Sequence, residues 1–160
     1  MSENLEYAED LIRKAKNHIE KAEEEIKRVL PNHSNIISWS QTAIELSGKA
    51  IFKIMGSEYP KDHQLLYGKK GIKEEVKDLL KKEFPRYFSK DEVPRVLLLT
   101  YFWHNFYTLA KYGIEELDFP PDKLFNKEDA ELAIKHAREC VAVADRLLGY
   151  KRIEEGDDVL

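Results

Sequence analysis

The chain has 160 residues, of which 42% are hydrophobic and 35% are charged, and its formal net charge is −4. A chain of this length can bury a core of its own, and its composition is too apolar for an intrinsically disordered protein. The negative total charge provides no general attraction to nucleic acid.

Cysteine content and the N-terminal segment indicate the compartment. Cys140 is the single cysteine, which excludes an intramolecular disulfide and fits a reducing environment. The first ten residues, MSENLEYAED, are polar and acidic and lack the apolar core of a secretory signal. We therefore expect a cytoplasmic protein that is not bound to a membrane. Lysine and glutamate dominate the charged residues, a bias that indicates a thermophilic source.

Apolar residues recur at steps of three and four along four long segments, which predicts four amphipathic helices. The expected helices cover Leu5–Leu30 (with Val29 on its apolar stripe), Asn32 or Ser34 to Met55, Lys90–Tyr112 and Lys127–Leu148, with a shorter one over Ile72–Glu83 whose inward side includes Ile72. No run alternates as a strand would, and Gly68-Lys69-Lys70-Gly71 is interpreted as a mobile basic turn.

Residues that end or begin helices support these boundaries. Pro31 is expected to end the first helix, and Gly56 suits a left-handed stop after the second. The sequence Ser89–Glu92 reads as a capping box, Asn126 as the cap of the last helix, and Gly149 as its stop. We therefore predict an all-α fold: an antiparallel up-and-down four-helix bundle with an additional short helix, in one domain over residues 1–150, followed by an acidic, flexible tail over 151–160.

The segment Val96–Ala110 is apolar or aromatic on nearly every face. At about 15 residues it is too short to cross a bilayer, which needs about 20, so we expect it to be buried in protein. One small protomer cannot cover all of it, which favours a homodimer. The expected interface residues are Val96, Leu99, Trp103, Phe106 and Tyr107.

The most informative stretch is SQTAIELSGKAIFKIMGSEYPKDHQLL, from Ser40 to Leu66. It predicts a long helix, a glycine stop, a tyrosine–proline loop and a histidine. The spacing of Gln41, Ala43, Glu45, Lys49, Ala50, Gly56, Pro60 and His63 resembles the HEPN family (higher eukaryotes and prokaryotes nucleotide-binding). The resemblance extends from about Tyr7 to Leu148.

This resemblance implies a helical bundle that binds a nucleotide or RNA. Members of the family are frequently encoded beside a minimal nucleotidyltransferase and act with it as toxin–antitoxin or related defence modules. The resemblance therefore implies a nucleotidyltransferase protein as a partner, in addition to a second copy of the chain.

Glu45 and Lys49 are four residues apart on a helix, which is the spacing of an ion pair, and we expect Glu45 to support a phosphate contact by Lys49. His63 could add a proton-transfer group or a phosphate contact. Lys111-Tyr112 resembles a basic residue–tyrosine pair of the family, with lysine in place of the usual arginine, and lysine cannot make the bidentate phosphate contact. The expected ligand pocket consists of Lys49, Tyr59, His63, Lys111 and Tyr112.

Many HEPN ribonucleases carry an arginine, four to six residues, and then a histidine near the start of a late helix. Here eight residues separate Arg95 from His104, and the literal match Arg28–His33 is interrupted by Pro31. We therefore assign no catalytic residue and favour a non-catalytic binding protein. A divergent ribonuclease that uses His104 or His63 remains an alternative, as does a purely structural dimerisation module.

The sequence predicts no cofactor and no metal site. Its five histidines are scattered, none has a cysteine partner at ligand spacing, and no glycine-rich phosphate loop occurs.

Overall fold

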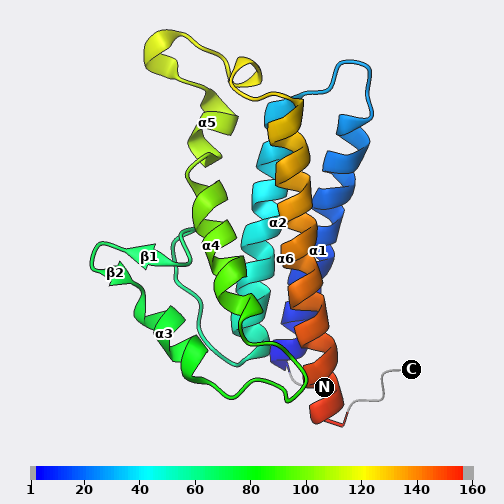
Figure 1. The fold of residues 1–160 in the computed structure, drawn as a ribbon, viewed down its shortest axis with the longest axis vertical. Coiled ribbons are helices and arrows are strands. Elements are labelled where there is room, and N and C mark those ends of the chain that lie inside the picture. Colours follow the sequence, from blue (N-terminus) through cyan, green and yellow to red (C-terminus); the bar gives the residue numbers. More distant parts are fainter. Residues whose placement is uncertain (1–2, 157–160) are drawn as a thin grey trace.

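The computed structural model describes residues 3–156. Its long helices are α1 (Glu3–Ile26), α2 (His33–Ile54), α4 (Glu92–His104) and α6 (Lys127–Glu154), and α5 (Tyr107–Tyr112) continues the line of α4. In Figure 1, α1 and α4 run toward one end of the molecule and α2 and α6 run toward the other. The all-α, up-and-down bundle is therefore confirmed.

The connection between α1 and α2 is longer than expected. The Asn32 side chain accepts a hydrogen bond from the backbone N–H of Asn35 at 3.0 Å, which confirms Asn32 as the cap of α2. The carboxylate of Glu25 accepts from the backbone N–H of Asn32 at 3.3 Å and binds Arg28 at 3.1 Å, so the chain leaves α1 before Pro31. Val29 is consequently 96% exposed, and its expected place on the apolar stripe is wrong.

The last helix begins as expected and ends later. Asn126 and Asp129 form a reciprocal capping box at the start of α6. Gly149 does not stop the helix, which continues to Glu154 because Leu148 is buried before it and Arg152 after it reaches Glu9 at 2.6 Å. Residues 157–160 of the expected tail lie outside the described residues.

The expected capping box of α4 is wrong. Asp91 is the N-cap and makes no hydrogen bond with its side chain. The carboxylate of Glu92 accepts instead from Arg146 Nη2 at 2.7 Å, which ties the start of α4 to α6. A tertiary ion pair has therefore replaced the local cap.

The expected single helix over Lys90–Tyr112 is broken into α4 and α5. The Asn105 side chain donates to the carbonyl oxygen of Tyr101 at 2.8 Å, and that oxygen is the acceptor that the next helical turn would use. Such local side-chain bonds compete with the helical ladder. The break lies at Asn105–Phe106, directly after His104.

The segment between α2 and α4 contains a small hairpin and one helix. Strands β1 (Tyr67–Gly68) and β2 (Gly71–Ile72) pair antiparallel and precede α3 (Glu74–Lys81). Figure 1 shows the hairpin and α3 beside the bundle rather than within it. The expectation of no strand is wrong at this point, because Gly71 takes φ 101° and lets the basic turn close a hairpin. Ile72 is 45% exposed, so its expected inward position is also wrong.

Helix α4 packs on α2 and α6 and divides its apolar residues between two faces. Three of the expected interface residues, Val96, Leu99 and Trp103, are buried within the protomer, where they have almost no surface to offer a partner. Phe106 is half-buried, and Tyr107 is exposed. The assignments of Val96, Leu99 and Trp103 to the interface need correction, because the core of one protomer covers more of α4 than its sequence suggested.

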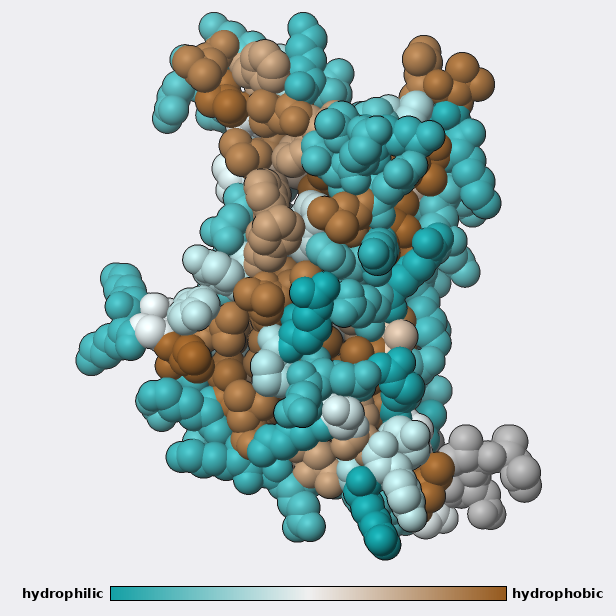
Figure 2. Space-filling view, in the orientation of Figure 1, coloured by the Kyte–Doolittle hydropathy of each residue, from teal (hydrophilic) through white to brown (hydrophobic). Residues whose placement is uncertain are grey.

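A second face of α4 remains uncovered. It carries Leu98, Tyr101 and Phe102, and Figure 2 shows apolar side chains along α4 and α5. A homodimer through α4 stays a prediction, with these residues as its contacts. Across residues 3–156, no helix is both long enough and apolar enough to cross a membrane.

Candidate functional site

Polar side chains of α2 gather on one face of the helix, at intervals of four residues. Nζ of Lys49 lies 2.9 Å from Oε1 of Glu45, and Gln41 Nε2 lies 3.5 Å from Oε2 of the same carboxylate. The side chains of Glu45 and Lys49 are only 12% and 18% exposed. Because each charge is largely withdrawn from water, each depends on the other for compensation. The predicted ion pair is therefore present and partly buried.

The loop after α2 brings His63 to this pair. Gly56, with φ 67°, ends α2, and the Asp62 carboxylate accepts from the backbone N–H of Gln64 at 3.1 Å in a local turn. Nδ1 of His63 then lies 2.6 Å from Oε1 of Glu45. The His63 side chain is 75% exposed, so one ring nitrogen is anchored while most of the ring faces solvent.

Helix α4 contributes a second histidine at its last residue. His104 Nδ1 is shielded from solvent and has no hydrogen-bond partner within residues 3–156. A shielded polar atom without a partner calls for an explanation, such as a catalytic role or a bound ion or water molecule. The break after α4 places this residue at the junction with α5.

These three elements enclose a cavity of about 280 Å³, which we call the α2–α4 cavity. Its lining combines a carboxylate, an ammonium group, two imidazoles and a primary amide with a few apolar atoms. The lining residues are Gln41, Thr42, Glu45, Leu46, Lys49, His63, His104 and Tyr107. Convergent polar groups in a cavity of this size are typical of a small-ligand subsite.

The structure unites only part of the expected pocket. Lys49 and His63 line the α2–α4 cavity, and Glu45 holds both, as expected. Tyr59 does not line this cavity, but it contacts a residue that does, since its ring centroid is 5.3 Å from Nζ of Lys49. The pKa of the Tyr59 hydroxyl is raised, mainly by a hydrogen bond with Tyr7.

Lys111 and Tyr112 do not line the α2–α4 cavity. Lys111 Nζ lies 5.7 Å from the ring centroid of Tyr107, which does line it, and 5.4 Å from that of Tyr112. Hydrogen bonds with the Tyr112 and Tyr107 hydroxyls raise the pKa of Lys111. Lys111 and Tyr112 therefore lie apart from the two histidines, and the single expected pocket is divided.

Sequence reasoning omitted Gln41, Thr42 and Leu46 from the pocket. Gln41 shares the helical face of Glu45 at a spacing of four, a signal that the sequence contains. The Thr42 hydroxyl donates to the carbonyl oxygen of Ser38 at 3.0 Å and closes the wall of the cavity. His104 was expected at the site only under the ribonuclease alternative. It lines the α2–α4 cavity because of the way α4 packs against α2.

A second and larger cavity lies on the other side of the loop. Its volume is about 940 Å³, and it lies between the loop Glu58–Asp62, the hairpin and the start of α3. Asp62 lines this cavity, whereas its neighbour His63 lines the first one. A hydrogen bond from Lys73 lowers the pKa of the Asp62 carboxyl and fixes the base of the hairpin.

Comparison with known proteins identifies the family. Residues 8–147 match the sequence model of the HEPN domain, which is most of the chain. No curated protein and no solved structure gives a significant match. Within the described residues, no three His, Cys, Asp or Glu side chains gather closely enough to hold a metal ion. Because the match covers nearly every helix of the bundle, the chain belongs to the HEPN family.

Proposed function

We propose that this protein binds the phosphate group of a nucleotide or an RNA strand in the α2–α4 cavity. Membership of the HEPN family supports a nucleotide- or RNA-related function. The observation that carries the proposal is the cluster of Glu45, Lys49 and His63, in which one carboxylate oxygen holds an amine and an imidazole at a cavity mouth. The ammonium group of a lysine makes charge-assisted hydrogen bonds to phosphate oxygens, and the carboxylate holds that group in place at the cavity.

The role of each residue follows from its charge and burial. Lys49 is the phosphate ligand, because its ammonium group lines the cavity and is held on a rigid helix. His63 is the second contact, at the exposed rim. Glu45 is a positioning residue that fixes both side chains and contacts no phosphate itself.

The binding test uses the intact protein and a fluorescent single-stranded RNA, with uridine monophosphate as a competitor. Lys49→Met is expected to weaken binding about tenfold or more, because one charged contact is lost. Lys14→Met is the matched control, since Lys14 is an exposed lysine of α1 that pairs with Asp10. Equal affinity of the Lys49→Met variant and the wild type would contradict the proposal.

A second candidate function is cleavage of RNA. It is favoured by one observation: His63 and His104 line the same cavity as Lys49. Two imidazoles can serve as base and acid for attack by the 2′-hydroxyl, and a lysine can stabilise the charge that develops on the phosphate.

The wild type is incubated with total RNA beside His63→Ala, His104→Ala and His33→Ala, where His33 is the histidine of the literal motif match. Cleavage lost only in the first two variants would establish a ribonuclease, and its absence in the wild type would favour binding alone.

The proposal includes a homodimer and a nucleotidyltransferase partner. Support for the dimer is the uncovered apolar face of α4, and support for the partner is the resemblance to HEPN proteins of toxin–antitoxin and defence modules. A nucleotidyltransferase encoded beside this gene is expected to co-purify with the tagged chain at a fixed stoichiometry. If it elutes separately by gel filtration at micromolar concentration, this part of the proposal fails.

A further inference from the structure

The larger cavity, which we call the lysine shelf, is lined by six lysines and four carboxylates, a net charge of +2 on a chain whose total is −4. Two of these lysines are neutralised within the structure: Lys73 binds Asp62, and Lys77 Nζ lies 3.1 Å from Glu74. No carboxylate of the described residues lies within ion-pair distance of Lys61, Lys69 or Lys70. The shelf therefore presents uncompensated positive charge, which is the electrostatic mark of a polyanion site.

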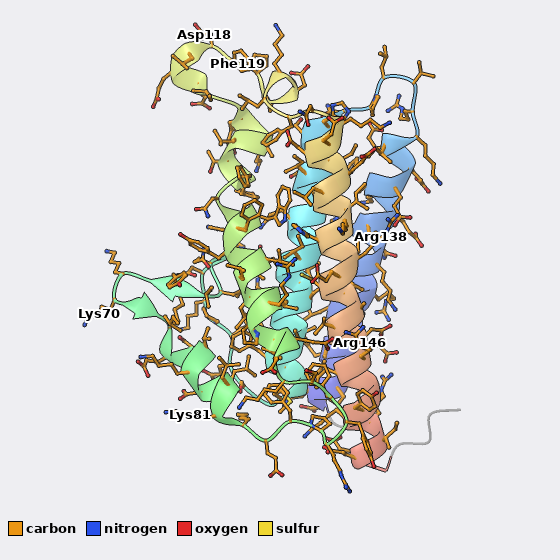
Figure 3. The ribbon with its side chains drawn as sticks, in the orientation of Figure 1. Lys70, Lys81, Asp118, Phe119, Arg138 and Arg146 are labelled. Atoms are coloured by element: carbon orange, nitrogen blue, oxygen red, sulfur yellow. The ribbon has the colours of Figure 1, made fainter. Side chains whose placement is uncertain are left out.

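Two of the uncompensated lysines are exposed and do not contribute to the core. Lys69 and Lys70 form the tip of the hairpin, between β1 and β2. Figure 3 shows Lys70 at this tip, directed away from the bundle. The hairpin contacts α4 through the ring of Tyr67, whose centroid lies 5.0 Å from that of the Tyr101 ring. The hairpin therefore presents the charged side chains of Lys69 and Lys70 to solvent.

The shelf and the α2–α4 cavity are adjacent, because Asp62 lines the shelf and the next residue, His63, lines the α2–α4 cavity. The ring of Tyr59 contacts both Lys49 of the α2–α4 cavity and Lys53 of the shelf, with its centroid 5.3 Å and 5.7 Å from their Nζ atoms. One aromatic ring therefore connects Lys49, the proposed phosphate ligand, with Lys53 of the shelf. The ring of Tyr59 is half-buried and lines the shelf, where a base could stack on its accessible part.

We infer that the lysine shelf binds the phosphodiester backbone of a single-stranded RNA whose reacting or anchored phosphate lies in the α2–α4 cavity. This inference rests on the proposed function and names its ligand class: a strand of several nucleotides rather than a free mononucleotide. A mononucleotide would occupy the smaller cavity and leave the shelf empty. Several phosphates in a row give the shelf, the ring of Tyr59 and the hairpin tip a common ligand.

The test measures RNA binding as a function of KCl concentration. The probe is a short 5′-fluorescein oligouridylate, read by fluorescence anisotropy, and uridine monophosphate binding is measured by calorimetry. The variant Lys69→Gln/Lys70→Gln changes only exposed residues, so the fold is retained. Lys27→Gln/Lys123→Gln is the control, because it removes the same charge from two exposed lysines outside the shelf.

The hairpin variant is expected to bind the oligouridylate about tenfold more weakly, and the slope of log affinity against log salt should become shallower by about 1.4, or about 0.7 for each lost contact to a single strand. Uridine monophosphate binding should be unchanged, and the control should match the wild type. Equal affinities and slopes for the hairpin and control variants would overturn the inference.

The two proposals fail in different ways. If the hairpin variant binds both ligands as the wild type does while Lys49→Met binds neither, the shelf has no role and the proposed function stands. If Lys49→Met binds both normally while the hairpin variant loses the oligouridylate, the shelf is an RNA site and the assignment of the α2–α4 cavity is wrong.

Discussion

His63 and Glu45 are 18 positions apart in the sequence, yet Nδ1 of His63 lies 2.6 Å from Oε1 of Glu45. The same oxygen lies 2.9 Å from Nζ of Lys49. One carboxylate thus joins the loop after α2 to the helix itself. The same loop carries Tyr59 and Asp62, which line the second cavity.

Loss of the Glu45 charge is expected to destabilise the protein. Glu45→Gln leaves the partly buried ammonium group of Lys49 without a compensating charge, and we expect the free energy of unfolding to fall by about 1–3 kcal/mol. Adding Lys49→Met should recover part of this loss, because the uncompensated charge is then gone. Urea denaturation measures both changes. Glu131→Gln is the control, since the pair Lys127–Glu131 is exposed and should change stability by less than about 1 kcal/mol. A double variant that is less stable than Glu45→Gln would contradict this account.

Stability is expected to fall in mild acid because of His136. Trp103 Nε1 donates to Nδ1 of His136 at 2.9 Å, which requires a neutral ring, and burial, reinforced by the charge of Arg95, lowers the pKa of His136 below its ordinary 6.5. The unfolded chain therefore takes up this proton first as pH falls. The free energy of unfolding should decrease as pH drops through 6.5 toward the folded pKa and should be independent of this group above 6.5.

The check on His136 is urea denaturation about one pH unit above and one below 6.5. The variant His136→Phe should lose less stability across this interval than the wild type. Burial also lowers the pKa of His18, so a smaller dependence in the same direction remains in the variant. Identical pH dependence of the two proteins would show that His136 does not titrate as described.

Gly113 should tolerate no side chain. It takes φ 70°, and a Cβ atom there would collide with the carbonyl oxygen of Phe119 and approach Pro121 N to 2.8 Å. Gly113→Ala is expected to lower the free energy of unfolding by about 1–3 kcal/mol. Gly149 offers the opposite case, because it lies within α6 with no atom near its absent Cβ. Gly149→Ala should raise stability by about 1 kcal/mol, as thermal denaturation can show. A destabilised Gly149→Ala protein would be inconsistent with an unobstructed helix at this point.

The uncovered face of α4 is expected to form the dimer. Phe102→Glu places a charge in the middle of this face and should convert a dimer into a monomer at micromolar concentration, measured by sedimentation equilibrium. Tyr87→Glu is the control, because Tyr87 is a 75% exposed aromatic residue outside α4. A wild type that sediments as a single protomer would refute the dimer, whatever the variants do.

Local signals were sufficient for the helices and for half of the site. The apolar periodicity located the bundle, Asn126 and Gly56 marked helix ends, and the spacing of four between Glu45 and Lys49 indicated their ion pair. These features depend on residues within one or two helical turns, which interact wherever the helix packs.

Other features were decided by contacts between distant segments. The Glu92–Arg146 pair replaced a local cap, and the pair of Arg152 and Glu9 accompanies the continuation of α6 past Gly149. Val96, Leu99 and Trp103 turned inward because α2 and α6 cover that side of α4.

By itself the sequence determined the all-α bundle, the polar face of α2 and the resemblance to the HEPN family. Only the tertiary structure decided that His63 and His104 meet at one cavity, that Lys111 stays outside it, and that a lysine-bearing hairpin lies next to it. The reason is that helical periodicity fixes which side of a helix a residue occupies, whereas the partner of that side depends on loop paths and on the packing of helices far apart in the chain.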